Sequence, residues 1–283
     1  MRISRDEPFT SSSVAFSLIS PGVKTSFLGV ILSPLVYILV FCAAFVGSGL
    51  KAVGGFGFAT LTTPTVAIFW DVPTAIAVIS IPTLCTSLMN AWRTRAAVHE
   101  GLRPFVPFFS MSLVGLAVGL TILLNTDPRL MKFILGAFLI CQIVWQWRQT
   151  EKPAPEESLK RSLGMGAVAG LMLGTINIPS HVIASYLTGM KISKERYLFV
   201  LSASQVVLRV AAIASIAAAG YIGETALWLI LVLTTPVLLG FFVGTKIYNI
   251  FTDQLFFRIV TIILFVMGAL LVVMNFEGIY AFF

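Results

Sequence analysis

Charged side chains are scarce in this sequence. Of its 283 residues, 11% are Asp, Glu, Lys or Arg and 58% are apolar. A soluble domain uses about a quarter of charged residues to cover its surface, so this composition excludes an ordinary soluble fold. The long apolar runs contain no Asp or Glu. That absence argues against a cation or drug exporter and against an intramembrane hydrolase, because both depend on buried carboxylates.

Cysteine and histidine are also sparse, and neither forms a recognisable ligand set. Cys42, Cys85 and Cys141 lie inside apolar runs without a CxxC spacing, which is typical of packing residues rather than of disulfides or metal ligands. His99 and Glu100 do not form an HExxH motif, and the chain has no Walker loop or dinucleotide fingerprint. We therefore expect no cofactor, no metal site and no enzymatic activity.

The chain is rich in apolar runs long enough to cross a bilayer. A helix that spans the hydrocarbon core needs ~20 apolar residues. Most runs approach that length, but the region 162–190 divides into two short pieces. The apolar runs are 28–46, 52–70, 74–92, 104–124, 129–147, 162–176, 178–190, 197–219, 225–245 and 255–275. The sequence predicts an all-α integral membrane protein of about eight to ten helical segments, with the lipid bilayer as its surroundings.

The net charge of +7 comes mainly from basic residues in the loops between the apolar runs. Basic residues gather in alternate loops, notably 93–103, 148–161 and 191–196, while the loops around Asp71 and Glu224 carry few of them. Lys and Arg mark cytoplasmic loops in membrane proteins. The charge therefore indicates topology, and we expect no nucleic-acid partner.

A polar linker divides the chain into two similar halves. Each half has a GxxxG step followed by an acidic residue and a last apolar run, and each has a glycine-rich break followed by proline; the steps are Gly115–Gly119 with Asp127 and Gly240–Gly244 with Asp253. Counting crossings from a cytoplasmic linker gives the halves opposite orientations, which is the inverted repeat of many secondary transporters. Each repeat is then a glycine-broken helical hairpin plus three transmembrane helices. The predicted parts are a polar N-terminal segment 1–27, a first repeat 28–147, the cytoplasmic linker 148–161 and a second repeat 162–283.

The two breaks resemble a known family. The stretch GSGLKAVGGFGFATLTTP (47–64) and its weaker echo GAVAGLMLGTINIP (166–179) are similar to the TauE/SafE family, also called sulfite-exporter or anion-permease-like proteins. The resemblance implies transport of sulfite, sulfonates or related anions across the bacterial inner membrane, often outward. The second half departs from the pattern, because residues 177–181 read Asn-Ile-Pro-Ser-His where the family usually has a second Gly-Gly or Gly-Pro turn. The polar groups offered to a substrate differ accordingly.

Two basic residues lie well inside apolar stretches, Lys51 and Arg209. An Arg near the bilayer centre costs about 2.5–3.5 kcal/mol on insertion scales, so it is retained mainly where it faces a polar cavity. Because the runs offer no carboxylate partner, a small anion is the natural ligand, and a guanidinium fork suits an oxyanion. The alternatives are that Arg209 caps backbone carbonyls freed by the breaks and that Lys51 snorkels from its break.

The breaks supply further candidate substrate-binding residues. Bare backbone at Gly54, Gly55 and Gly57 would let an anion reach the N–H groups of the next helix, although close helix packing explains such glycines equally well. The second break offers Asn177, Ser180 and His181, and His181 would bind the anion, carry a coupling proton or serve as an ordinary hydrogen-bonded residue. Asn90 and Gln205 are buried-polar candidates whose amides bind either a ligand or another helix.

Together these features predict a secondary transporter, with export as the expected direction. The substrate is expected to be a small anion such as sulfite, a sulfonate or another organosulfur anion, moved by alternating access between the two repeats. The alternatives are a transporter of small carboxylates and an intramembrane enzyme that acts on a lipid-linked anion. The coupling ion, the side of the N-terminus and the oligomeric state stay open, a homo-oligomer included.

Overall fold

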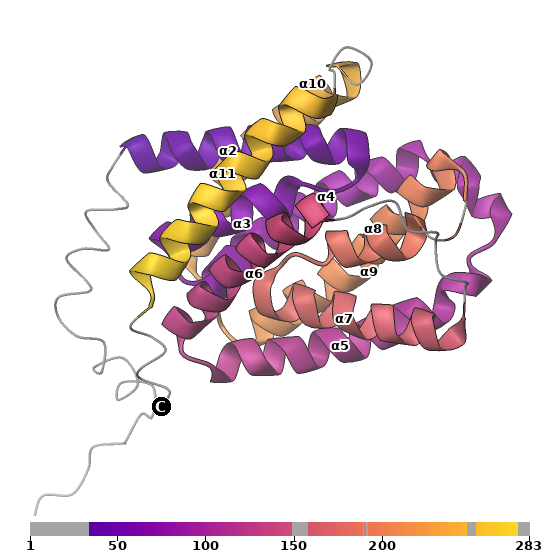
Figure 1. Ribbon diagram of the computed structural model, residues 1–283, viewed down its shortest axis with the longest axis horizontal. Helices are drawn as coiled ribbons and strands as arrows, with labels where there is room; N and C mark the ends of the chain where they lie inside the picture. The colour runs from indigo at the N-terminus through magenta and orange to yellow at the C-terminus, as the bar shows by residue number, and fades with distance from the viewer. Residues whose placement is uncertain (1–33, 149–157, 189, 191, 248–252, 277–283) are drawn as a thin grey trace, which may run out of the picture. The chain divides into compact units, whose positions relative to one another are not determined.

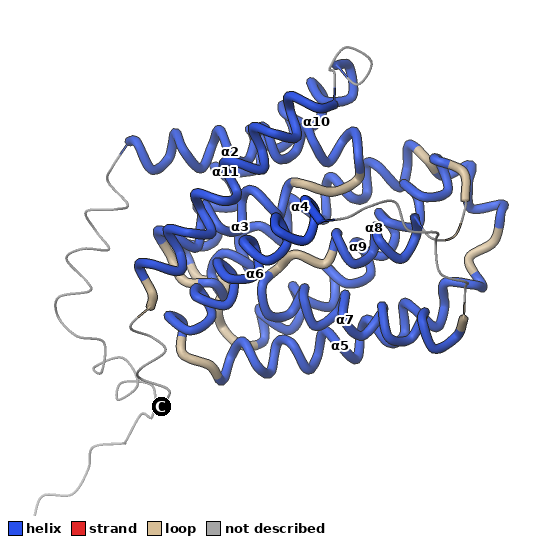
Figure 2. The backbone as a smooth tube through the Cα atoms, in the orientation of Figure 1, coloured by secondary structure: helices blue, strands red, loops and turns tan. Residues whose placement is uncertain are grey.

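The described part of the chain is helical. A computed structural model describes residues 34–148, 158–188, 190, 192–247 and 253–276, and these contain helices and no strand (Figures 1 and 2). The α-helices are α2 (Pro34–Gly54), α3 (Phe58–Phe69), α4 (Val72–Arg93), α5 (Val106–Asn125), α6 (Pro128–Arg148), α7 (Leu159–Ile176), α8 (Ser180–Thr188), α9 (Lys194–Ala218), α10 (Glu224–Ile247) and α11 (Asp253–Met274). Two short 3₁₀ helices, η1 (Arg95–Glu100) and η2 (Arg103–Phe105), connect α4 to α5. The predicted all-α fold is confirmed.

The chain divides into two units, Met1–Ile38 and Leu39–Phe283. The described part of the first unit is the beginning of α2. The second unit contains the rest of α2 and every later helix, so all the packing and contacts below belong to it.

Polar caps set the beginnings of several helices. Asp71 accepts a hydrogen bond from the backbone N–H of Thr74 at 2.7 Å and so caps α4. Ser158 and Ser193 accept from the third residue of α7 and α9 in the same way, each at 3.2 Å. Such caps satisfy N–H groups that have no partner inside the helix. They also explain why charged and polar residues concentrate where the apolar runs begin.

The first break lies later than the apolar runs suggest. The run boundaries at 46 and 52 place a gap at residues 47–51, but α2 is continuous to Gly54. Gly47 and Gly49 lie inside this helix, where a side chain would have little room: a Cβ at Gly47 would meet the Phe58 backbone at 3.1 Å, and one at Gly49 would meet the Gly240 carbonyl at 3.3 Å. The chain turns instead at Gly55 and Gly57, whose φ values of 78° and 116° favour glycine.

The second break lies within the predicted motif. Helix α7 ends at Ile176, and Asn177 takes a left-handed conformation with φ 66° before Pro179 and the short helix α8. Asn is one of the few residues other than Gly that adopt this conformation readily. The prediction of two short pieces within 162–190 is therefore confirmed.

The GxxxG steps are sites of close helix packing. Gly115 and Gly119 of α5 lie against Ala167 and Leu171 of α7, where an added Cβ would overlap backbone atoms. Gly240 and Gly244 of α10 lie in the same way against α2, next to the backbones of Phe45 and Gly49. Small residues that let membrane helices approach closely explain both steps.

The two halves share their helix order. Each runs through a long helix, a break, a short helix and three longer helices, α2 to α6 and then α7 to α11. Packing is also reciprocal: α5 packs on α7 and α10 on α2, while α4 packs on α9 and α6 on α11. This order agrees with a repeat, and the opposite orientation of the halves in the bilayer stays a prediction.

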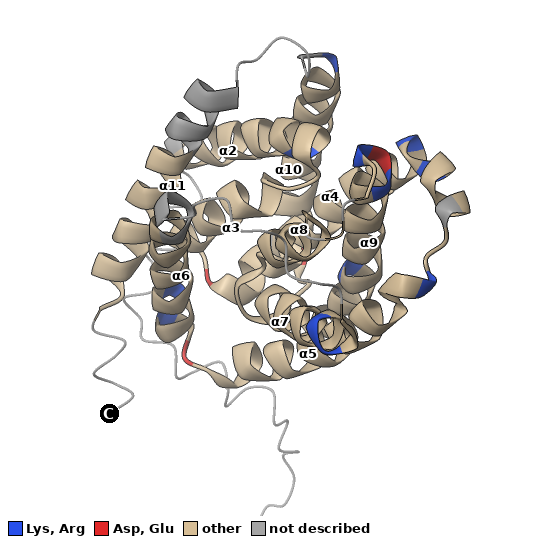
Figure 3. Cartoon of the chain, turned by 45° about the vertical axis from the view of Figure 1, so that its right-hand side comes forward, with Lys and Arg blue, Asp and Glu red and all other residues tan. Residues whose placement is uncertain are grey.

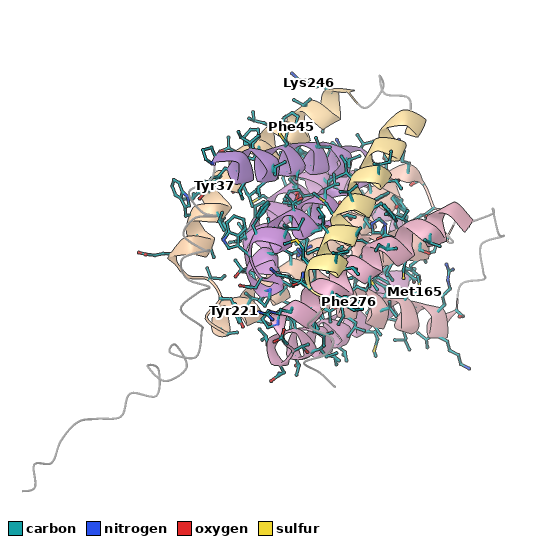
Figure 4. The ribbon with its side chains drawn as sticks, turned by 60° about the vertical axis from the view of Figure 1, so that its left-hand side comes forward. Tyr37, Phe45, Met165, Tyr221, Lys246 and Phe276 are labelled. Carbon is teal, nitrogen blue, oxygen red and sulfur yellow. The ribbon has the colours of Figure 1, made fainter. Side chains whose placement is uncertain are left out.

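The described helices suit a bilayer. Five of them are long and apolar enough to cross a membrane, Val36–Gly54, Val72–Arg93, Arg103–Asn125, Lys194–Ala218 and Ala226–Lys246. Large apolar side chains such as Leu231 and Val114 are exposed on their outer faces, as a lipid environment requires. Lys and Arg lie mainly near helix ends in Figure 3, and Figure 4 shows Lys246 at the outer end of α10. The chain is a multi-pass membrane protein.

Candidate functional site

Lys51 is fully inside the fold. It lies in the last turn of α2 and is 1% exposed. Its ammonium donates to the Thr83 carbonyl at 2.9 Å and to Ser87 Oγ at 2.7 Å, both on α4. These bonds use two of its three donors, and both partners are neutral. The side chain thus reaches across to α4 and does not snorkel to the surface.

The end of α2 is capped by side chains from α4 and α9. Asn90 Nδ2 donates to the Lys51 carbonyl at 3.1 Å, and Arg93 donates to the Ala52 carbonyl at 2.8 Å. From α9, Gln205 Nε2 donates to the Gly55 carbonyl at 3.1 Å. The last carbonyls of a helix have no partner within it, so these groups stabilise the first break. The predicted residues Asn90 and Gln205 therefore both act on the backbone beside Lys51.

Arg209 holds the second break. It lies on α9 and is 1% exposed. One guanidinium nitrogen donates to Asn177 Oδ1 and to Ser80 Oγ at 3.2 Å, and the other terminal nitrogen lies 3.5 Å from the Asn177 carbonyl. Asn177 Nδ2 in turn donates to Thr63 Oγ1 at 2.9 Å. The capping alternative for Arg209 thus describes its present contacts, yet its Nε is buried without a partner.

Side chains of one helix, α9, form hydrogen bonds to both breaks. Gln205 and Arg209 are one turn apart on α9, and they bond to Gly55 and Asn177 respectively. The facing helix α4 presents Ser80, Thr83 and Ser87, which serve Arg209 and Lys51. We call these side chains together with the two breaks the α4–α9 site.

The α4–α9 site has positive charge without a buried counter-charge. Among the described residues, the buried polar set contains Lys51 and Arg209 and no Asp or Glu. An unpaired buried charge is costly. Hydrogen bonds to hydroxyls, an amide and carbonyls offset part of that cost but leave the charge itself uncompensated. An anion between α4 and α9 would supply what the protein lacks.

His181 lies apart from the two cations. It is the second residue of α8, and its Nε2 lies 3.1 Å from Thr60 Oγ1 of α3 and 2.8 Å from Gln142 Nε2 of α6. The ring of Phe56 meets it edge-on, with centroids 5.6 Å apart. The Oε1 atom of Gln142 is buried without a partner. We call His181, Thr60 and Gln142 the His181 site.

The glycines of the first break lie close to neighbouring side chains, and their role as anion ligands stays a prediction. A side chain at Gly55 would overlap Leu201 of α9, and one at Gly57 would meet Leu50 at 2.8 Å. Gly54 faces the ring of Phe56. Gly57 is the N-cap residue of α3 and gives no side-chain cap, so the first N–H groups of α3 are available to an anion. Ser180, 4% exposed, lies at the start of α8, and its role as a ligand stays a prediction.

Sequence reasoning missed the hydroxyls, the Thr83 carbonyl and the amide that complete both sites. On α4, Ser80, Thr83 and Ser87 recur at helical spacing, so a polar stripe within the run 74–92 was a usable signal. Thr60, Thr63 and Gln142 had no comparable signal, because their importance depends on which helices they face.

Among the described residues, no group of three His, Cys, Asp or Glu could hold a metal ion.

Comparison with known proteins gives one match. The family described as sulfite exporter TauE/SafE matches residues 39–271, which is most of the chain. Neither a curated protein nor a solved structure matches.

Proposed function

This chain belongs to the TauE/SafE family of sulfite exporters and is a membrane transporter, and from that premise we propose that it exports a small oxyanion across the bacterial inner membrane. Sulfite, sulfonates and other organosulfur anions are the proposed substrates. The observation that carries the proposal is the pair of buried cations, Lys51 and Arg209, without a buried carboxylate among the described residues.

An entering anion can replace the present hydrogen-bond acceptors of both cations. Lys51 and Arg209 bond to a carbonyl, two hydroxyls and one amide, all of them neutral. An anionic acceptor adds the attraction between opposite charges to the hydrogen bond, which a neutral acceptor does not. An entering oxyanion would therefore compete well for these donors, and the unpartnered Nε of Arg209 would be the first one open to it.

Binding at Arg209 would also act on the break that Arg209 holds. If an anion draws the guanidinium away from Asn177, it weakens the link between α9 and the turn between α7 and α8. Gln205 one turn earlier keeps its bond to the first break. Substrate binding would thus loosen the second break inside the second repeat, while the bond from Gln205 to Gly55 still joins the two repeats. We propose this as the step that starts alternating access between the two repeats.

Transport by proteoliposomes tests the anion site. Sulfite, thiosulfate, sulfoacetate and short carboxylates are offered to wild type and to Arg209→Ala, with Arg103→Ala as the matched control because Arg103 is exposed. We expect Arg209→Ala to lower transport by about tenfold or more, since a hydrogen bond to a charged group contributes about 1.5–3 kcal/mol. Control rates should match wild type.

Two results would change the conclusion. Equal rates for Arg209→Ala and wild type with every anion would refute the role of Arg209. Faster movement of the carboxylates than of every sulfur anion would reassign the substrate class while leaving the site in place.

A further inference from the structure

The His181 site joins elements of both halves without using either cation. Thr60 belongs to α3 and Gln142 to α6, while His181 begins α8 just after the second break. We infer that this site binds a proton that is transported together with the anion, an inference that rests on the proposed function and adds its coupling ion.

Each neighbour of His181 can serve both protonation states of the ring. Neutral imidazole has one ring nitrogen that accepts, and protonated imidazolium donates from both. The Gln142 amide nitrogen, 2.8 Å from Nε2, donates to the neutral ring. A half-turn of the amide would bring Oε1, now buried without a partner, into the same place as an acceptor. The Thr60 hydroxyl, 3.1 Å away, donates or accepts as required.

The site therefore binds a proton without a carboxylate. A charged imidazolium in an apolar surrounding needs acceptors at its N–H groups. Gln142 and Thr60 provide them at Nε2 once the Gln142 amide has rotated. This resolves how a chain whose described, buried side chains include no Asp or Glu could still carry a coupling proton.

Charged groups around His181 are few, and Arg209 is the most closely linked. Helix α3 has no ionisable residue. Lys132 of α6 is ten residues from Gln142 and Arg161 of α7 is fifteen residues from the end of its helix, about 15 Å and 22 Å along the axes. Arg209 bonds to Asn177, four residues before His181. The remaining ionisable residues with described side chains on α6, α7, α8 and α9 are Arg129, Cys141, Lys160, Tyr186, Lys194, Glu195, Arg196 and Tyr197.

This arrangement couples the proton to the anion. An anion on Arg209 would neutralise a positive charge that is linked to His181 through Asn177, and so favour a second one on His181. Linkage is reciprocal, so a proton on His181 raises anion affinity by the same factor. The two ligands then travel together. A dianion accompanied by one proton still carries a net negative charge, so an inside-negative membrane potential favours its exit, while a proton gradient that is acidic outside opposes it.

Thiosulfate is the probe for this test because it stays fully ionised near neutral pH, so any proton that moves with it is bound by the protein. Proteoliposomes with the potential clamped by K⁺ and valinomycin receive an imposed pH gradient of about one unit, which supports roughly tenfold accumulation for one proton per anion. Thiosulfate uptake and internal pH are recorded together. We expect accumulation in the direction of the proton gradient and matching acidification.

Variants assign the proton to its site. His181→Gln keeps a side chain that donates and accepts but does not titrate, and we expect it to transport thiosulfate downhill without accumulation or acidification. His99→Gln, which alters the exposed second histidine, should behave as wild type. Gln142→Leu removes the amide that rotates between donor and acceptor, and we expect this variant also to lose thiosulfate accumulation.

Three outcomes would overturn the inference. Thiosulfate uptake by wild type without proton movement would refute coupling and leave the proposed function intact. Retention of the tenfold accumulation by His181→Gln would move the proton to another residue. Absence of movement of any anion by wild type would refute the proposed function itself.

Discussion

The packing of α5 against α7 predicts that two Gly→Ala substitutions in α7 change the stability of the protein in opposite directions. At Gly170 of α7, an added Cβ would overlap the Ser112 carbonyl and lie 2.6 Å from the backbone nitrogen of Leu116. Both atoms belong to the α5 backbone, which cannot move aside as a side chain can. At Gly164 of the same helix, a Cβ would have no neighbour within 4 Å. Gly170→Ala and Gly164→Ala are therefore matched variants that differ only in what the methyl group meets.

The magnitudes follow from two effects. Replacing Gly by Ala inside a helix contributes about 0.8–1.0 kcal/mol of stability through propensity. Overpacking costs typically 1–3 kcal/mol, and more where backbones must separate. Gly164→Ala should thus gain up to about 1 kcal/mol. Gly170→Ala should lose about 1–2 kcal/mol or more, because the separation of α5 from α7 outweighs the gain in propensity.

Unfolding in detergent micelles, followed by near-UV circular dichroism or by intrinsic tryptophan fluorescence, measures both variants against wild type. We expect a lower melting temperature for Gly170→Ala by several degrees, at about 2–4 °C per kcal/mol for a chain of this size class. Gly164→Ala should melt at or above the wild-type temperature. If Gly170→Ala proved as stable as Gly164→Ala, the close approach of α5 and α7 would be wrong.

Two further predictions separate structural from functional roles within the α4–α9 site. Lys51→Met removes a buried charge that has no counter-charge, so we expect unchanged or higher stability together with loss of anion transport. Loss of stability with normal transport would contradict this expectation. The control is Lys246→Met at the exposed end of α10. Gln205→Leu leaves the Gly55 carbonyl without its donor, and we expect a loss of about 1–3 kcal/mol in the free energy of unfolding; a loss of only a few tenths would show that the first break does not depend on this cap.

The sequence by itself determined the class of the protein and its unusual residues. The cost of placing charge in hydrocarbon acts on each residue separately, so apolar length predicted the membrane helices, and Lys51 and Arg209 stood out at once. Backbone preferences are local as well, which is why the second break could be located at Asn177 and Pro179.

Only the tertiary structure decided the partners of these residues. Side-chain hydrogen bonds between helices depend on how each helix is rotated and offset against its neighbour, and no spacing along one helix contains that information. Within α2, which extends to Gly54, Gly47 and Gly49 lie close to Phe58 and Gly240, residues that are distant in the chain or on another helix. The links from Lys51 to Ser87, from Arg209 to Asn177 and from His181 to Gln142 arise in the same way, because each joins helices that are distant in the chain.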